Sequence, residues 1–374
     1  MIEFKTKNKT KESLRAASAF SLFSAVKGSF GVRISLGSTL LFSLAASERG
    51  LVTPDRCAPG AAAAADALAA KFDRHQFVLI GSTHGDAKIE EFIMCLMTRP
   101  AFQQRVTDIV VEWAGSGHQG MLDRYVMAQE SIPNEDLAAV WLDTDYPTLW
   151  ASLPQVRQSV EVLREVNRAL PSTKRIRLVA GNEGVDWSSV RVADDLAPYP
   201  FKTNFMLHLL VEHLARTPGN RTLIVYGDAH IRIEGSTWMR EVEAAVGRSQ
   251  LFIVGRIGGL RAEEREYLAA VGDPSQAFFV EANRFPTNIP WPASLRVRLE
   301  ERSPRLADYI DAFVYLGPAP DKDLTDSVPL TPVQRRELDR RRGITSDPER
   351  TMRARFQGRP QWFRAHPNDF PPRP

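Results

Sequence analysis

Two Gly-x-x-His turns and one glutamate carry the residue types that could do chemistry in this chain of 374 residues. The first turn runs from Gly81 to His84, the second from Gly227 to His230, and Glu112 lies between them in the sequence. Each group directly follows a short apolar run, where a strand would end. Glycine lets the chain turn sharply there, so each histidine would stand at the start of the next helix. Such residues can act as general acids and bases or bind a divalent metal.

The start of a helix would also set the chemistry of His84. Backbone N–H groups and the positive end of the helix dipole suit an anionic ligand or a developing oxyanion. The same field disfavours an imidazolium, so we expect His84 to stay neutral and to serve as a base or a metal ligand.

Further polar residues are expected at the same edge of the sheet. Ligands of parallel sheets bind beyond the carboxyl ends of the strands, and polar side chains buried there would need partners. Asp228 has a purely structural alternative, because aspartate is also a preferred helix N-cap. The candidate binding residues are Gly81, Ser82, Gly227, Asp228, Glu183 and Arg256.

Apolar runs that alternate with helical segments must position these residues. This alternation predicts an α/β fold with a mostly parallel sheet. The runs are continuously apolar, which is typical of strands covered by helices on both faces. The last two runs are expected to add edge strands. In chain order the runs are 77–80, 109–111, 176–180, 223–226, 251–254, 278–280 and 312–316.

Composition divides the chain into three regions. Residues 1–60 resemble a leader and linker, 61–318 form the α/β domain, and 319–374 form a tail rich in proline and arginine. The domain should open with an alanine-rich helix at 61–72. In the tail, Thr331 followed by proline predicts the start of a short helix, and the remainder is expected to be poorly ordered.

An inserted helical segment is predicted at about 122–170, broken by Pro133, Pro147 and Pro154. Its aromatic side chains either line a pocket or lid or pack the inserted helices together. These side chains are Trp141, Tyr146 and Trp150.

Charge and hydropathy exclude some classes of function. The net charge is +3, and the basic excess lies mainly at the two ends of the chain. No basic patch is interleaved with aromatic residues, so a nucleic-acid partner is not expected. No apolar run is long enough for a transmembrane helix. The expected partner is a small-molecule or peptide substrate, and the oligomeric state stays open.

Cys57 and Cys95 are the two cysteines of the chain. Neither lies in a Cys-x-x-Cys pair, which excludes a cysteine metal site. Cys95 falls within an apolar helical pattern and is interpreted as a buried free thiol.

Residues 34–47 have the order of a secretory signal, with basic residues before an apolar stretch and small residues at its end. The alternative is a disordered or mistranslated leader. An exported and a cytoplasmic location therefore both stay open.

The order Gly-x-x-His-Gly, Val-Glu and Gly-x-Ala-His resembles the superfamily of erythromycin esterases, ChaN-like haem-uptake proteins and Tiki/TraB proteins. The resemblance covers about 77–316, including a closing strand at 311–315. It implies an α/β core with two histidines and a glutamate at the site. Carried over, these residues are His84, His230 and Glu112.

Two positions depart from the family pattern. Ser82 stands where the esterase and ChaN branches carry glutamate, and this is more like the Tiki/TraB branch. Lys202, four residues before Met206, stands where the esterases carry arginine. Lysine keeps the charge but loses the bidentate fork.

These residues predict a hydrolase of an ester, amide or peptide bond. Without a metal, His84 would activate water while Glu112 or His230 orients it. With a metal, His84, Glu112 and His230 would be three ligands with an open position for water. Zinc, manganese, cobalt or iron would suit them. Lys202 or Arg256 would stabilise the transition state.

The alternative is a haem- or small-ligand-binding protein of the ChaN type without catalysis. Tyr125 and Tyr226 are available as haem ligands in that interpretation.

Overall fold

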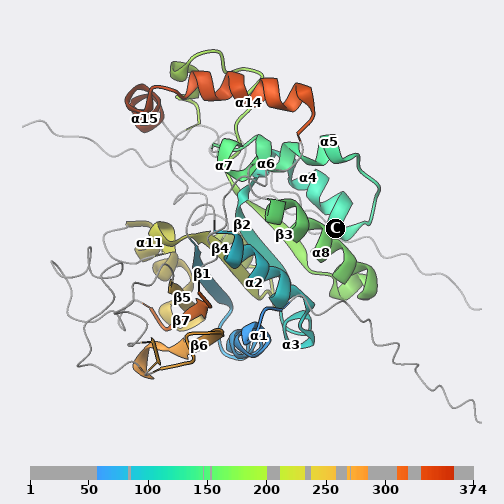
Figure 1. The fold of residues 1–374 in the computed structure, drawn as a ribbon, viewed down its shortest axis with the longest axis vertical. Helices are drawn as coiled ribbons and strands as arrows, with labels where there is room; N and C mark the ends of the chain where they lie inside the picture. The colour runs from blue at the N-terminus through green and yellow to red at the C-terminus, as the bar shows by residue number, and fades with distance from the viewer. Residues whose placement is uncertain are drawn as a thin grey trace, which may run out of the picture. The chain divides into compact units, whose positions relative to one another are not determined.

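The residues that the computed structural model describes form one sheet with helices on both of its faces (Figure 1). They are 57–82, 86–145, 147–151, 154–199, 211–231, 237–257, 268–269, 271–284, 310–318 and 330–357. The strands are β1 (Phe77–Ser82), β2 (Asp108–Gly115), β3 (Arg177–Asn182), β4 (Thr222–Gly227), β5 (Leu251–Ile257), β6 (Ala277–Glu281) and β7 (Ala312–Leu316).

The order of the strands is β3-β2-β4-β1-β5-β7-β6. All neighbours run parallel except β6, which is antiparallel to β7. The predicted α/β class is confirmed, and each of the seven apolar runs coincides with a strand, although Ile176 of the third run lies directly before β3. The prediction that both late runs form edge strands is wrong for β7, because it pairs with β5 on one side and β6 on the other.

Alternate side chains of each inner strand enter two separate apolar cores. In β1, Val78 and Ile80 join the core beneath α1 and α2, whereas Phe77 and Leu79 join the core on the other face. All four are fully buried. Burial on both faces explains why the strands read as continuous apolar runs in the sequence.

The first core lies beneath α1 (Ala61–Ala69), α2 (Ala87–Thr98), α3 (Pro100–Gln103) and α8 (Pro154–Ala169). The second is covered by the helical residues 211–215, by α10 (Asp228–Ile231) and by α11 (Thr237–Val246). None of the helices in the described ranges has the length and apolarity that a membrane crossing requires.

The predicted insertion is helical and is broken at its prolines. It contains α4 (Gln119–Leu122), a π-helix (Asp123–Met127), α5 (Asn134–Leu137), α6 (Ala139–Leu142), α7 (Pro147–Ala151) and α8. Pro147 and Pro154 are each the first residue of a helix, where a missing N–H costs nothing. Trp141 and Trp150 are buried in the core of this insertion, so they pack its helices together.

The insertion also covers the free edge of β3. The Gln119 side chain donates to the carbonyl of Leu178 at 3.0 Å and accepts from the N–H of Ala180 at 2.7 Å. Arg177 of β3 forms a bidentate ion pair with Asp123, at 2.8 and 2.6 Å. An exposed edge strand would be open to pairing with another chain, and these contacts close it.

The C-terminal segment holds two helices, α14 (Pro332–Ile344) and α15 (Pro348–Gln357). Thr331 caps α14 as predicted, since its hydroxyl accepts from the N–H of Gln334 at 3.2 Å. The expectation of poor order directly after a short helix is wrong for 348–357. Those residues are helical because α15 packs on the loop after β3.

A disulfide joins Cys57 to Cys95 of α2. The interpretation of Cys95 as a free thiol is therefore wrong. The apolar helical pattern around Cys95 correctly indicates burial, but a pairing over 38 residues leaves no local signal in the sequence. The bond ties the segment before α1 to the first core.

Loss of this bond should lower the stability of the protein measurably. Closing a loop of 38 residues restricts the unfolded chain, and the expected loss in Cys95→Ser is about 3–4 kcal/mol of unfolding free energy. Urea unfolding with and without reductant measures it. Reductant should destabilise the wild type and leave Cys95→Ser unchanged. A wild-type midpoint that does not move on reduction would contradict the expectation.

Candidate functional site

Glu112 and His230 meet at the carboxyl edge of the sheet. Glu112 lies in β2 and His230 in α10, which begins directly after the neighbouring strand β4. The Oε2 atom of Glu112 accepts from the N–H of Gly227 at 2.6 Å, and its Oε1 atom lies 3.4 Å from Nε2 of His230. The exposed fractions of the two side chains are 6% and 17%. The structure thus brings together two of the three residues predicted for the centre of the site.

An irregularity in β2 accompanies this placement. The register between β2 and β3 shifts between Val111 and Gly115, around Glu112. Such irregularities re-aim side chains next to many functional sites. A carboxylate this deeply buried requires hydrogen-bond partners, and the backbone of Gly227 supplies one.

Tyr226 forms the floor beneath this pair. Its hydroxyl donates to the carbonyl of Gly181, and its ring meets the His230 ring edge-on, with centroids 6.2 Å apart. Burial, and then the charge of Glu112, raise the pKa of Tyr226 well above its usual range. A side chain on Gly181 would collide with this hydroxyl, so glycine is required there.

The two tyrosines considered as haem ligands are both engaged in the protein. Tyr226 is fully buried, and its hydroxyl is held by Gly181. The Tyr125 ring is buried under the guanidinium of Arg164, which lies 4.1 Å from the ring centroid.

The first Gly-x-x-His turn begins beside the second. Gly81 and Ser82 end β1 and pair with Tyr226 and Gly227 of β4. His84 lies outside the described residues, and so does Lys202. Asp228 is the first residue of α10, which is a placement that both the binding and the capping interpretation allow.

Arg256 of β5 forms a buried ion pair with Asp86. Asp86 caps α2 by accepting from the N–H of Lys88 at 3.1 Å. Burial raises the pKa of Asp86, and the charge of Arg256 opposes that shift. Burial likewise lowers the pKa of Arg256. Arg256 therefore holds the start of α2 at the site through Asp86. Asp86 was not among the predicted residues, because an N-cap position does not by itself mark a functional residue.

Three loops gather beyond the ends of β2 and β3. The backbone carbonyl of Glu183 joins two of these loops, because it accepts a hydrogen bond from the Ser116 hydroxyl at 2.7 Å. His118 lies with Nε2 at 2.9 Å from Oδ2 of Asp143. Nothing in the sequence around His118 indicates this pairing, since its partner lies in the insertion.

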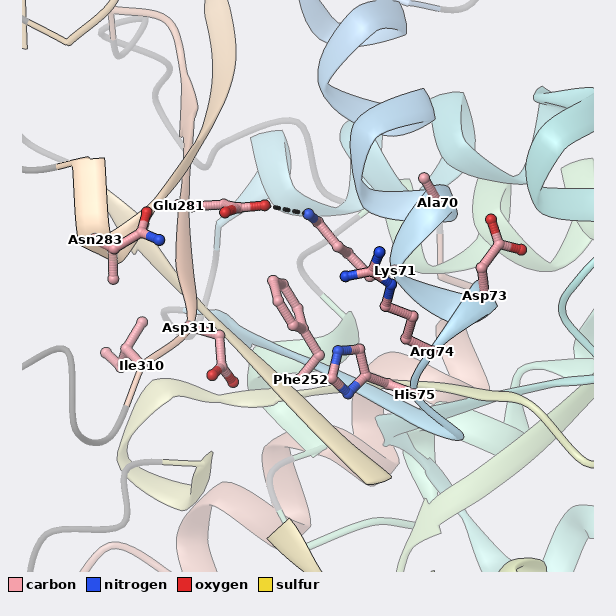
Figure 2. Close-up of a pocket in the computed structure, with 11 residues that line it drawn as sticks. Ala70, Lys71, Asp73, Arg74, His75, Phe252, Glu281, Asn283, Ile310 and Asp311 are labelled. Carbon is pink, nitrogen blue, oxygen red and sulfur yellow. Dashed lines mark hydrogen bonds and ion pairs between the residues drawn. The ribbon is translucent and has the colours of Figure 1, made fainter. Parts of the chain in front are cut away.

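A cavity occupies the opposite edge of the sheet (Figure 2). Its volume is about 680 Å³, and none of its described lining residues belongs to the predicted site. They are Ala70, Lys71, Asp73, Arg74, His75, Phe252, Glu281, Ala282, Asn283, Ile310 and Asp311.

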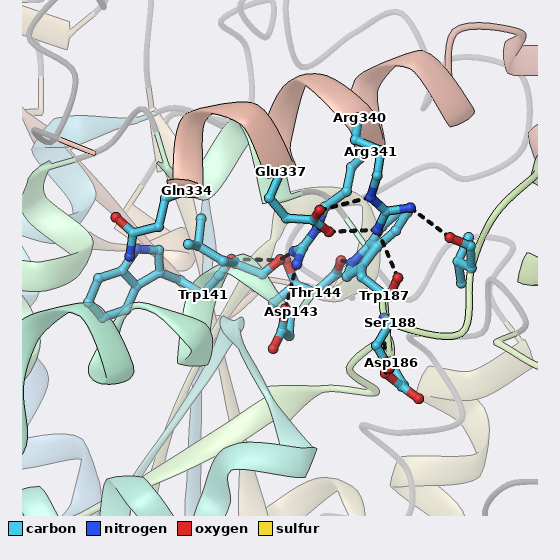
Figure 3. Close-up of polar contacts among 12 residues, drawn as sticks. Trp141, Asp143, Thr144, Asp186, Trp187, Ser188, Gln334, Glu337, Arg340 and Arg341 are labelled. Atoms are coloured by element: carbon cyan, nitrogen blue, oxygen red, sulfur yellow. Dashed lines mark hydrogen bonds and ion pairs between the residues drawn. The ribbon is translucent and has the colours of Figure 1, made fainter. Parts of the chain in front are cut away.

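Two arginines of α14, Arg340 and Arg341, hold the loops at the carboxyl edge (Figure 3). Arg341 donates to the carbonyl of Leu142 at 2.5 Å and pairs with Asp143 at 3.0 Å. Arg340 donates to the carbonyls of Trp187 and Val190 at 2.8 and 2.7 Å. α14 therefore holds the insertion and the loop after β3 together.

Two carboxylates complete this fastening. Glu337 accepts from both Arg340 and Arg341, and these hydrogen bonds lower its pKa to about 2. Asp145 pairs with Arg355 of α15 at 3.1 Å and accepts from Asn182, the last residue of β3, at 2.7 Å. These ion pairs could not be predicted, because the arginines and their carboxylate partners lie far apart in the sequence. Only the arginine-rich composition of the C-terminal segment was visible.

Glu90 is buried between α2 and α8. Its carboxyl group accepts from the Ser159 hydroxyl at 3.2 Å. Burial raises the pKa of Glu90 to about 7, although the Ser159 hydrogen bond favours the ionised form. The helical pattern of α2 placed this residue correctly on a helix but did not single it out.

Among the described residues, no group of three histidine, cysteine, aspartate or glutamate side chains is arranged to hold a metal. His84 lies outside those residues, so the predicted set of His84, Glu112 and His230 stays a prediction.

Comparisons with known proteins add a limited likeness. No protein-family profile and no curated protein matches the sequence. A protein from Bacillus cereus of known structure is 11% identical, with a TM-score of 0.42, over 67% of this chain and 90% of that one. The type III effector HopBA1 is 10% identical, with a TM-score of 0.38, over 71% of this chain and 100% of that one.

Glu90 should make the stability depend on pH in a defined direction. Because its folded pKa lies near 7 and its ordinary value is 4.5, the folded state binds the proton more tightly. Its contribution is present below about pH 4.5 and is lost as the pH rises through 7. From pH 5 to pH 8, Glu90→Gln should gain roughly 2–3 kcal/mol of stability relative to wild type.

Urea unfolding at both pH values measures this change, and Glu165→Gln, at an exposed position of α8, is the control. Glu165→Gln should keep the pH dependence of wild-type stability. If Glu90→Gln kept it as well, the burial effect would be refuted.

Arg341 and its neighbour Arg342 form a matched pair for testing the C-terminal fastening. The exposed fractions of their side chains are 9% and 68%. Arg341→Ala should lower the unfolding free energy by about 2–3 kcal/mol, because it leaves buried acceptors unpaired. Arg342→Ala should change it by less than about 0.5 kcal/mol. Equal effects of the two substitutions in chemical denaturation would argue against this role of α14.

Proposed function

We propose that this protein is a hydrolase in which His230 and Glu112 act as one unit to activate water on an ester, amide or peptide bond. The observation that carries the proposal is the buried carboxylate of Glu112, held by the N–H of Gly227 at 2.6 Å and turned to His230 at 3.4 Å. Carboxylates that orient a histidine in this way are a recurring part of general acid–base sites.

The chemistry follows from the order of these contacts. His230 takes a proton from the attacking water, whose oxygen forms the new bond to the carbonyl carbon, and the Glu112 carboxylate stabilises the imidazolium that forms. The imidazolium then returns the proton to the alcohol or amine that leaves as the ester, amide or peptide bond breaks. Gly227 holds Glu112 in place through one oxygen and leaves the other to face the imidazole. The rigid floor of Tyr226 fixes the backbone at Gly181 and packs against the imidazole edge. His84 would join this unit from the turn that begins beside Gly227.

The same residues fit a divalent metal. At 3.4 Å, the two atoms are farther apart than in most N–H···O hydrogen bonds. Two ligand atoms bound at about 2.1 Å in a tetrahedral site lie about 3.4 Å from each other. Glu112, His230 and His84 would hold zinc, manganese, cobalt or iron, and such an ion lowers the pKa of water and polarises a carbonyl group. The proposed family is the erythromycin esterase, ChaN and Tiki/TraB superfamily named above.

Substitutions at the pair should separate catalysis from packing. Glu112→Gln and His230→Ala should each lower turnover by about a hundred- to ten-thousand-fold. Both variants should keep the wild-type circular dichroism spectrum, because the two side chains line the sheet edge and lie outside the two apolar cores. His213→Ala, an exposed histidine of the helical residues 211–215, is the matched control and should keep full turnover.

The measurement is a screen of ester, amide and peptide substrates with the purified protein, beside metal analysis of each variant. In the metal-assisted form, His230→Ala should also lose bound metal. Stoichiometric haem binding without any turnover would replace the hydrolase by the carrier alternative. Unchanged turnover in both variants would refute the proposal.

A further inference from the structure

The cavity at the amino edge of the sheet has the size of a ligand site (Figure 2). Phe252, the second residue of β5, forms its floor, and Asp311, directly before β7, lies on one wall. Glu112 and His230 lie at the carboxyl edge, so this cavity is separate from the site described above. Its volume of about 680 Å³ falls within the range of about 300–1,000 Å³ typical of small-molecule sites.

The carboxylates of the cavity are neutralised by the protein itself. Asp311 accepts from Arg248 at 2.7 Å and from the N–H of Ile253 at 2.7 Å. Asp73 accepts from Arg105 at 2.8 Å. These two acidic side chains are therefore fastened to the fold and leave little negative charge for a ligand to meet.

Lys71 and Glu281 form the third neutral pair. They bind each other across the cavity, and this hydrogen bond lowers the pKa of Glu281. The Lys71 ammonium group also lies over the Phe252 ring, 5.3 Å from its centroid. The pair closes one side of the cavity.

Arg74 is an exposed arginine of the cavity whose charge acts on Asp73 and Glu281 through space. Its guanidinium group points into the cavity toward Lys71 (Figure 2). It makes no hydrogen bond or ion pair with any residue that the structure describes. A guanidinium group in this position offers a planar fork of donors to a carboxylate or phosphate.

The half-buried ring of His75 lies beside this charge and rests on the buried ring of Phe252. The His75 ring contacts Phe252, with centroids 5.2 Å apart and planes at 44°. His75 is fixed in that position because Nδ1 donates to the carbonyl of Ser249 at 3.0 Å. A flat ring can pack against such an aromatic pair with additional gain beyond its buried area.

From this juxtaposition we propose that the cavity binds a small aromatic anion. Arg74 receives the anionic group, a phosphate or a carboxylate, while the ring packs on the half-buried imidazole of His75, which Phe252 supports from below. The proposal is independent of the hydrolase site, since it uses none of its residues.

Calorimetric titration of the full chain with 1-naphthyl phosphate and with inorganic phosphate tests both parts of the proposal. 1-Naphthyl phosphate should bind saturably and more tightly than inorganic phosphate. Arg74→Ala should weaken both by about tenfold, because it removes a charged hydrogen-bond donor. His75→Ala should weaken only 1-naphthyl phosphate, by about fivefold.

Arg336→Ala, an exposed arginine of α14, is the matched control and should bind like wild type. The cationic analogue 1-naphthylmethylammonium should bind at least tenfold more weakly than 1-naphthyl phosphate. The proposal is overturned by the absence of saturable binding, by equal binding of the cationic analogue, or by equal losses in Arg74→Ala and Arg336→Ala.

Discussion

The hydrogen bond from the N–H of Gly227 to the buried carboxylate of Glu112 is the contact on which the site depends. It joins β2 to the end of β4 through a side chain rather than through the sheet ladder. A carboxylate that is 5% exposed would be costly without such a donor. The same contact fixes the direction of the second carboxylate oxygen, and so places His230 opposite it. The arrangement of Glu112 and His230 at the carboxyl edge thus follows from the hydrogen bond that the buried Glu112 carboxylate requires.

The elements around this edge are held by contacts between distant parts of the chain. Arg256 and Asp86 fasten the start of α2 to β5, and Arg355 and Arg341 fasten the C-terminal helices to the insertion. The disulfide of Cys57 and Cys95 ties the segment before α1 to α2.

Much of the fold could be predicted from local patterns, because burial on both faces produces apolar runs and helix caps have a local chemical signature. The seven strands, α2, the insertion broken at prolines and the cap at Thr331 were all visible in this way. The inner position of β7 was not, because strand order depends on pairings that no single run encodes. The helix α15 was also not predicted, because it is stabilised by contacts with the loop after β3.

The residues of the candidate site likewise fall into those that local sequence patterns predict and those that depend on distant partners. Glu112, Gly227 and His230 were predicted because each follows an apolar run in the sequence, and parallel strands bring their ends together. Asp86, Glu90, Asp143 and Arg341 were missed because their importance lies in partners far away in the sequence. Arg256 was found by position, but its ion pair with Asp86 gives it an anchoring role that position alone could not indicate.

A double-mutant cycle on turnover measures whether Glu112 and His230 act as one unit. Residues that act together are strongly non-additive in kinetics. If the two residues act together, Glu112→Gln combined with His230→Ala should be no slower than the slower single variant. Losses that multiply in the double variant, as for two independent groups, would contradict it.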